Sequence, residues 1–309
     1  MKKNAWFAYA CAVGFTLIMG AVSAVGKISV AYKLPVLVVV IRYFLAVVGN
    51  FVMHHTGIVH VHYKGKGKRE LLLLSGICYA GSYVFQLWGV MYVSSVVNGV
   101  MIATVPIWTE VIARIFLKEK TTLLQNGFLF LSAGSVMAMV LIGSSDSVRG
   151  IDIRGLLLLF IAFIMEAANG VIIRSLREEY SSAELSYSST LISLGITTVI
   201  LAVQLGTHTI DQSMIAAAFG DWKFVASVLF LGLGGTFIAA LLKGYILQHM
   251  SALRATAWYN AATPVAVIFG VLFLKEPFYL YQIICTVLIL AGVLGIQICK
   301  GYKQKEGDD

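Results

Sequence analysis

The chain has 309 residues, of which 59% are apolar and only 12% are charged. A surface that faces water needs far more charge, so the composition excludes a soluble globular protein and indicates an integral membrane protein. The formal net charge of +8 would suit a nucleic-acid partner only on a basic soluble domain, and the sequence contains no such domain. We therefore attribute the positive charge to Lys and Arg residues that set the membrane topology and attract anionic lipid. We expect no nucleic-acid partner.

Apolar stretches long enough to cross a bilayer follow one another along the whole chain. Each needs roughly 20 residues as a helix. They cover residues 6–25, 34–53, 71–91, 95–116, 123–143, 155–173, 186–205, 223–243, 252–274 and 279–299. Helices are expected because an unpaired backbone amide in lipid costs several kcal/mol and the stretches lack the alternation of barrel strands. The sequence predicts an all-α integral membrane protein with ten transmembrane helices.

The two halves of the chain repeat each other. The letters FLKE end an apolar stretch at Phe116–Glu119 and again at Phe273–Glu276, and an Ala-Gly pair follows in the next stretch of each half. Because an odd number of crossings separates each element from its copy, the two halves are predicted to be inserted in opposite orientations around a central cavity, as in many secondary transporters. The predicted divisions are a first five-helix repeat at 1–145, a second at 150–302 and a charged tail at 303–309.

The positions of Lys and Arg predict the orientation. With the N-terminus placed inside, most of the 23 Lys and Arg residues lie at the inner ends of the stretches. Cytoplasmic loops carry this excess in most membrane proteins. We expect a multi-pass protein of the cell membrane with both termini in the cytoplasm.

Charged residues inside the apolar stretches are candidates for function, because each is costly at the bilayer centre unless it faces a cavity or a partner. Glu166 lies in the middle of the sixth stretch, and Asn169 shares its helix face, so we expect both to line the cavity. The alternative is a neutral Glu166, or one paired with Arg42, which we interpret as a structural charge. Glu110 and Arg114 are spaced for a structural i,i+4 ion pair.

Two prolines occupy equivalent apolar stretches, four and nine. Pro106 and Pro264 each remove a helix hydrogen bond from a span that we expect to be otherwise intact. Such helices can bend, so the prolines are candidate gates at the two membrane faces; a static kink is the alternative. Aromatic and amide side chains near them, or in the third stretch, complete the predicted substrate site: Tyr83, Gln86, Trp88, Asn98, Trp108, Trp258, Tyr259 and Asn260. Trp88 and Trp108 also suit an interfacial belt.

Motifs for other chemistry are missing from the sequence. There is no GxxxxGK[ST] phosphate loop, and the glycines of Gly232–Gly235 lie within an apolar stretch, where small residues favour close helix packing. Four histidines, His54, His55, His60 and His62, have spacings that a metal site could use, but a solvated loop explains them better. We expect no metal and no cofactor, and leave coupling to protons open.

These features resemble a known family. Each half has a Pro-bearing fourth helix, an acidic residue at its end, then Gln125 or Gln282 and an Ala-Gly helix. The chain is similar to EamA-type members of the drug/metabolite transporter superfamily, most typically in ATPVAVIFGVLFLKEPFYLYQIICTVLILAGV. The resemblance implies a central cavity built from spans one, three, four, six, eight and nine, and export of amino acids and related metabolites. The chain departs from the family pattern at Lys118, Lys275 and Glu166.

The functional hypothesis is a secondary transporter, not an enzyme, that exports amino acids or related amines by alternating access. Glu166 would bind a substrate ammonium or a coupling proton, and Asn98, Asn169 and Asn260 would orient the substrate. Import or efflux of quaternary amines such as choline, or of cationic drugs, is the alternative, because a carboxylate beside aromatic rings suits those ligands too. A multi-pass membrane enzyme and a passive channel are further alternatives. The expected partners are a small-molecule substrate and the lipid bilayer, with the chain a monomer or homodimer.

Overall fold

The structure is a computed structural model that describes residues 2–56, 67–116, 123–143, 152–176, 178–249, 252–276 and 279–306. Every regular element in these ranges is a helix. The first half contains α1 (Lys2–Ser29), α2 (Pro35–His55), α3 (Arg69–Tyr92), α4 (Ser95–Ile102), α5 (Val105–Phe116) and α6 (Leu123–Gly143). The second half contains α7 (Ile153–Leu176), α8 (Ser182–Gly206), α9 (Gln212–Gly220), α10 (Trp222–Leu229), the π-helix η1 (Phe230–Ile238), α11 (Ala239–His249), α12 (Ala252–Leu274) and α13 (Leu280–Glu306).

All of the predicted apolar stretches lie on helices. The fourth is divided between α4 and α5, and the eighth runs through α10, η1 and α11, while α9 is a short helix that the sequence did not predict. Within the described residues, seven helical segments are long and apolar enough to cross a membrane. The all-helical membrane fold is therefore confirmed, and the number of ten crossings stays a prediction.

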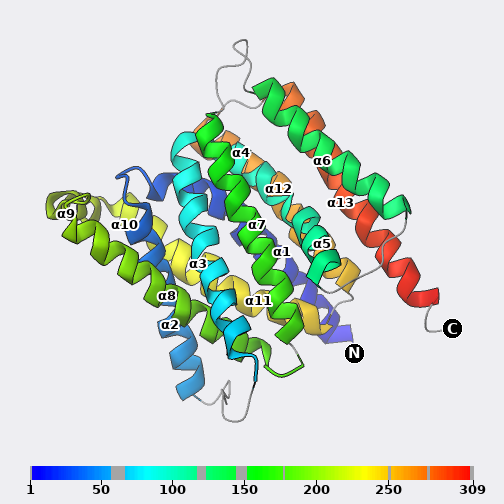
Figure 1. Cartoon of the computed structure of the whole chain (residues 1–309), viewed down its shortest axis with the longest axis horizontal. Helices are drawn as coiled ribbons and strands as arrows, with labels where there is room; N and C mark the ends of the chain where they lie inside the picture. Colours follow the sequence, from blue (N-terminus) through cyan, green and yellow to red (C-terminus); the bar gives the residue numbers. More distant parts are fainter. Residues whose placement is uncertain are drawn as a thin grey trace.

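Equivalent helices of the two halves run in opposite directions. On α6 and α13, Gly295 packs against Phe128 and Gly292 against Ser132, while Tyr281 and Ile142 meet at the other end of the pair. Figure 1 shows these two helices side by side at one edge of the molecule. The fourth helix of each half behaves in the same way, because α4 and α12 also pack with opposed directions. The two repeats are thus inverted, as predicted.

Most of the helix packing is symmetric between the halves. α3 packs on α7, and the equivalent second-half segment, η1 with α11, packs on α1. In the same way α1 packs on α12, and α7 packs on α4 and α5. The symmetry is broken near the centre. There α1 also packs on α3 and α4, and α2 packs on α3, whereas the equivalent contacts of α7 with η1, α11 and α12, and of α8 with η1 and α11, are at most marginal in the described residues. The two halves therefore adopt different arrangements around the centre.

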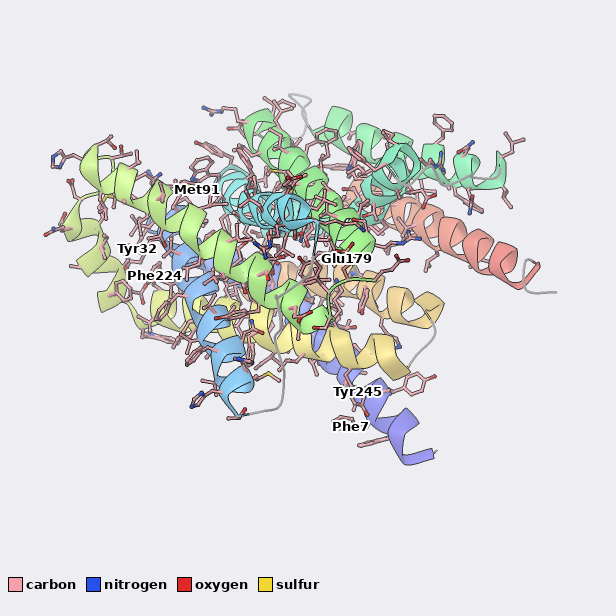
Figure 2. All side chains as sticks on the ribbon, turned by 60° about the horizontal axis from the view of Figure 1, so that its bottom comes forward. Phe7, Tyr32, Met91, Glu179, Phe224 and Tyr245 are labelled. Atoms are coloured by element: carbon pink, nitrogen blue, oxygen red, sulfur yellow. The ribbon has the colours of Figure 1, made fainter. Side chains whose placement is uncertain are left out.

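The opposite ends of α3 define the two faces of the molecule. At its start, Lys68 Nζ lies 2.8 Å from Glu179 Oε1, and this hydrogen-bonded pair raises the pKa of Lys68. We call this end the Glu179 face. At its other end, α3 lies near Lys27 and Glu276, and we call that end the Glu276 face. Aromatic pairs join helices near both ends: Phe7 meets Tyr245, and Tyr32 meets Phe224 (Figure 2).

The two prolines have different effects on their helices. Pro264 lies inside the continuous helix α12, as expected. At Pro106 the helix is interrupted, because α4 ends at Ile102 and α5 begins at Val105, although Ser95–Phe116 still counts as one candidate membrane span. Proline has no N–H to donate to the carbonyl of Ile102, and the Thr104 hydroxyl bonds the Met101 carbonyl at 2.7 Å, so the chain makes a tight turn there.

Candidate functional site

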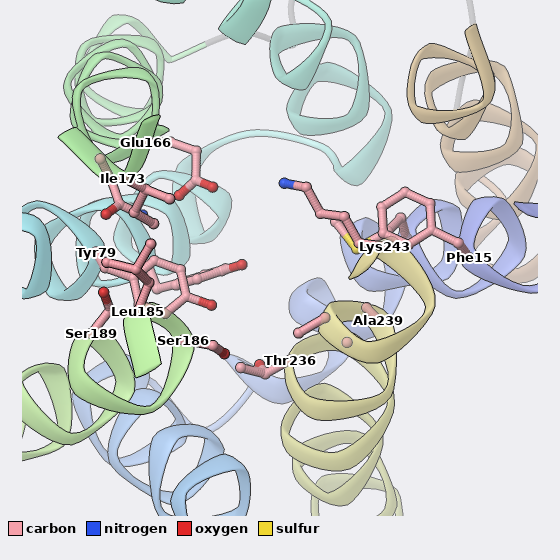
Figure 3. Close-up of a pocket in the computed structure, with 15 residues that line it drawn as sticks. Phe15, Tyr79, Glu166, Ile173, Leu185, Ser186, Ser189, Thr236, Ala239 and Lys243 are labelled. Carbon is pink, nitrogen blue, oxygen red and sulfur yellow. The ribbon is translucent and has the colours of Figure 1, made fainter. Parts of the chain in front are cut away.

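A cavity of about 240 Å³ lies among α1, α3, α7, α8, η1 and α11. Its residues come from the middle of α3 and from the parts of α7, α8 and α11 nearest the Glu179 face, so the cavity opens toward that face. Figure 3 shows side chains from opposite walls that point into the same space. The polar groups that line it belong to Tyr79, Tyr83, Glu166, Asn169, Ser186, Ser189, Thr236 and Lys243.

Glu166 and Asn169 both line this cavity, where the sequence placed them. Glu166 is half-buried, and its Oε2 accepts a hydrogen bond of 3.0 Å from the Ser82 hydroxyl. Asn169 Oδ1 accepts a bond of 2.8 Å from Ser75 Oγ, which also lies 2.8 Å from Ser189 Oγ. The serines fix the orientation of the Asn169 amide, so its nitrogen is the end that remains to donate to a ligand.

Arg42 is fully buried directly behind the cavity wall. Its Nε donates to Thr236 Oγ1 at 2.5 Å, its Nη2 donates to the Gly235 carbonyl at 3.4 Å, and its Cζ lies 3.7 Å from the centre of the Tyr83 ring. Nη1 is buried without a hydrogen-bond partner. Among the described residues no carboxylate lies within ion-pair distance of Arg42, so the alternative of a Glu166–Arg42 pair is not found.

The π-helix η1 packs closely against α1 and α2, next to Arg42. A Cβ on Gly235 would lie 2.8 Å from Val22 Cγ2, and one on Gly232 would lie 2.6 Å from Leu45 Cδ1, so both positions need glycine for the packing observed. The Thr236 hydroxyl donates to the Leu231 carbonyl, five residues earlier. Single turns of π-helix are frequent at functional sites. The glycines pack closely, as the sequence predicted.

Gln86 and Asn98 do not line the cavity. Gln86 Nε2 donates to Asn98 Oδ1 at 3.3 Å, and Asn98 Nδ2 donates to Ser23 Oγ at 3.1 Å. All three side chains are buried, and they join α3, α4 and α1 between the cavity and the Glu276 face. Next to them, Gly99 packs against Ala266 of α12. We call this region the plug, because it fills the path from the cavity to the Glu276 face.

The predicted aromatic residues divide among several places. Tyr83 lines the central cavity, whereas Trp88 lines a separate one of about 290 Å³ near the Glu276 face. Trp108 packs edge-on against Phe160 of α7, with ring centres 4.8 Å apart.

Span nine forms a layer behind the cavity. The Trp258 carbonyl accepts a bond of 3.0 Å from Thr16 Oγ1. The Tyr259 ring packs against Phe15, which lines the cavity, and lies 5.5 Å from Lys243 Nζ. The side chain of Asn260 lies outside the described residues.

Glu110 and Arg114 form the i,i+4 ion pair that their spacing predicts. Arg114 Nε lies 3.6 Å from Glu110 Oε1, and Arg114 Nη1 donates to Asn126 Oδ1 at 2.6 Å. The pair joins α5 to the start of α6, away from the cavity. Neither residue lines the central cavity.

Several cavity residues were missed from the sequence: Tyr79, Ser186, Ser189, Thr236 and Lys243. A signal for the serines was present, because they are three residues apart on one face at the start of an apolar helix. Lys243 gave no such signal, since a Lys at the end of a span usually reflects membrane topology.

A charged cluster closes the Glu276 face. The carboxylate of Glu276 accepts hydrogen bonds from the backbone N–H groups of Ser95 and Val96, both at 3.0 Å, and from Ser95 Oγ at 2.6 Å. Lys27 Nζ donates to the carbonyls of Val90 and Val93, both at 2.6 Å. The carboxylate thus lies at the positive end of α4 and the ammonium at the negative end of α3, the arrangement that helix dipoles favour. We call this cluster the outer clamp.

Comparison with known proteins agrees with this architecture. The EamA-like transporter family matches residues 6–141 and again residues 153–298. The chain belongs to the EamA-like transporter family. This family is part of the drug/metabolite transporter superfamily, so the resemblance seen in the sequence is confirmed. The two matched segments correspond to the two inverted repeats.

Individual relatives match the chain over nearly its full length. The chain is 27% identical over 299 residues to the uncharacterized transporter YcxC of Bacillus subtilis, covering 96% of this chain and 95% of that protein. It is 24% identical over 293 residues to an uncharacterized transporter of Archaeoglobus fulgidus, covering 95% and 98%. A protein of known crystal structure shares the fold, with a TM-score of 0.63 and 12% identity over 93% of this chain and 95% of that one.

Proposed function

We propose that the protein is a secondary transporter that exports small amine-bearing metabolites, such as amino acids, across the cell membrane by alternating access. The observation that carries the proposal is the Glu166 carboxylate inside a cavity at the centre of the helix bundle. An acidic group at this depth is costly unless it serves a substrate or ion pathway. The hydrogen bond from Ser82 does not neutralise the Glu166 carboxylate, so a ligand cation or a proton would balance its charge.

The closed Glu276 face supports alternating access. The cavity opens toward the Glu179 face, while the plug and the outer clamp fill the other side. In the present state α1 contacts α3 and α4. The equivalent contacts in the other half, of α7 with η1, α11 and α12, are at most marginal in the described residues. Forming those equivalent contacts and breaking the present ones would open the cavity to the opposite face. With both termini in the cytoplasm, as the charge distribution predicts, the present state faces inward.

The size of the cavity favours a small substrate. Pockets for drug-sized ligands usually have volumes of about 300–1,000 Å³, and this one has about 240 Å³. The rings of Tyr79 and Tyr83 line it beside Glu166, which also suits a small quaternary amine such as choline. Transport of such an amine is the second candidate function, and a cationic drug fits less well.

Replacing Glu166 by glutamine is expected to weaken recognition of the amine. The variant keeps the size and the bond to Ser82 but loses the charge that balances an ammonium, so affinity should fall at least about tenfold. A thermal-shift screen of amino acids, polyamines and choline would identify a ligand, and uptake into proteoliposomes would measure its transport. Glu179→Gln, which removes a carboxylate outside the cavity, is the matched control. Equal uptake by the wild type and Glu166→Gln would contradict the proposal.

A further inference from the structure

The charge on Arg42 has no counter-ion in the described part of the chain. Arginine stays protonated in proteins, and a buried charge without a partner is strongly unfavourable. Here the guanidinium is fully buried, bonds only a hydroxyl and a carbonyl, and leaves Nη1 without an acceptor. Glu166, the acidic side chain of the cavity, is bonded to Ser82. A structural arginine would be expected to have a carboxylate partner, so this one is unexplained by packing alone.

The guanidinium is separated from the cavity by a single layer of residues. Tyr83, Gly235 and Thr236, which contact it, all line the cavity on their other side. A positive charge at this position acts across that thin layer because protein screens a charge less than bulk water does.

A second cation lies on the same wall. Lys243 follows Thr236 by two helical turns, so the two residues share a helix face, and both line the cavity. Figure 3 shows the Lys243 side chain extending into the cavity, with Glu166 on the wall opposite. The cavity therefore has a positive wall, formed by η1 and α11 with Arg42 behind them, and a negative group on α7.

We propose that the positive wall is a carboxylate subsite and that the transported substrate is a zwitterion. Its ammonium group lies at Glu166, and its carboxylate lies against Lys243, Thr236 and Tyr83. Lys243 contacts the carboxylate, whereas Arg42 acts as a specificity residue through its charge behind the wall. This inference rests on the proposed transport function and narrows it, because choline and polyamines offer no anion to the positive wall.

The test compares each amino acid with the amine that lacks its carboxylate. Suitable pairs are L-leucine with isoamylamine and L-phenylalanine with phenethylamine, measured by calorimetric titration of the purified full-length protein. The wild type is expected to bind the amino acid of at least one pair about tenfold or more tightly than its amine. Lys243→Gln should remove most of this preference while leaving the affinity for the amine unchanged or higher. Lys33→Gln, in the separate cavity near the Glu276 face, should leave the preference unchanged.

Variants of Arg42 refine the test. Arg42→Lys keeps the charge and should keep most of the preference, whereas Arg42→Gln should lose it. If Arg42→Gln does not fold, Lys243→Gln still decides the matter, because Lys243 is exposed to the cavity. Equal affinities for amino acids and amines in the wild type would overturn the carboxylate subsite and leave amine transport intact. Absence of binding by both members of every pair would overturn the carboxylate subsite and the proposed amino-acid transport together.

Discussion

Replacing Glu276 by glutamine is expected to open the Glu276 face of the transporter. The Glu276 carboxylate belongs to the second repeat, and the N-terminus of α4 that it caps belongs to the first. Charge-assisted hydrogen bonds to a helix N-terminus are worth more than neutral ones. Loss of the charge should weaken the closed arrangement by about 1–3 kcal/mol, which is a shift of roughly 5- to 150-fold in the equilibrium between states.

The shift can be measured by the reactivity of a cysteine placed in the plug. Ser23→Cys introduces a buried thiol between the cavity and the Glu276 face, in a background with the native cysteines replaced by alanine. A membrane-impermeant maleimide added at the Glu276 face should label it faster when Glu276→Gln is also present. Glu179→Gln makes the same charge change at the other face and should not accelerate labelling. An unchanged rate with Glu276→Gln would show that the outer clamp does not hold the face closed.

Replacing Gly89 by leucine is expected to destabilise the helix bundle severely. Gly89 of α3 and Gly155 of α7 pack against each other, and a Cβ on either residue would lie 3.0 Å from the carbonyl oxygen of the other. A Cβ on Gly89 would also meet Leu159 Cδ2 at 2.8 Å. A backbone carbonyl cannot move aside as a flexible side chain can, so overpacking should cost about 1–3 kcal/mol or more.

Thermal unfolding in detergent measures this effect. The melting temperature of Gly89→Leu should fall by several degrees, or the variant should fail to accumulate. Gly195→Leu is the matched control, because Gly195 is exposed on α8 and a Cβ there meets nothing within 4 Å. Melting temperatures that fall equally for both variants would mean that the α3–α7 contact is not as close as described.

The helices and the inverted repeat could be predicted because both follow from local patterns. Apolar stretches need only length and composition, and the FLKE repeat needs only comparison of the chain with itself. Glu166 and Asn169 were also predictable, since an intramembrane carboxylate with an amide on the same face indicates a cavity.

Depth within the bundle could not be predicted in the same way. Gln86 and Asn98 carry the same kind of signal as Asn169 but lie in the plug, because helical periodicity gives the face of a residue and not its distance from the cavity. The two halves also have similar sequence patterns, so the sequence does not indicate which face of the molecule is closed. Arg42 was interpreted as structural because its lack of a carboxylate partner is visible only in three dimensions.

Labelling of three single cysteines tests most directly whether two inverted repeats surround a cavity that opens toward the Glu179 face. Glu179→Cys, Lys275→Cys and Ser186→Cys place thiols at one face, at the other face and in the cavity, again without the native cysteines. Impermeant reagent in oriented vesicles should label positions 179 and 275 from opposite sides, and position 186 from the same side as 179. Labelling of 179 and 275 from one side, or of 186 only from the side of 275, would contradict the account.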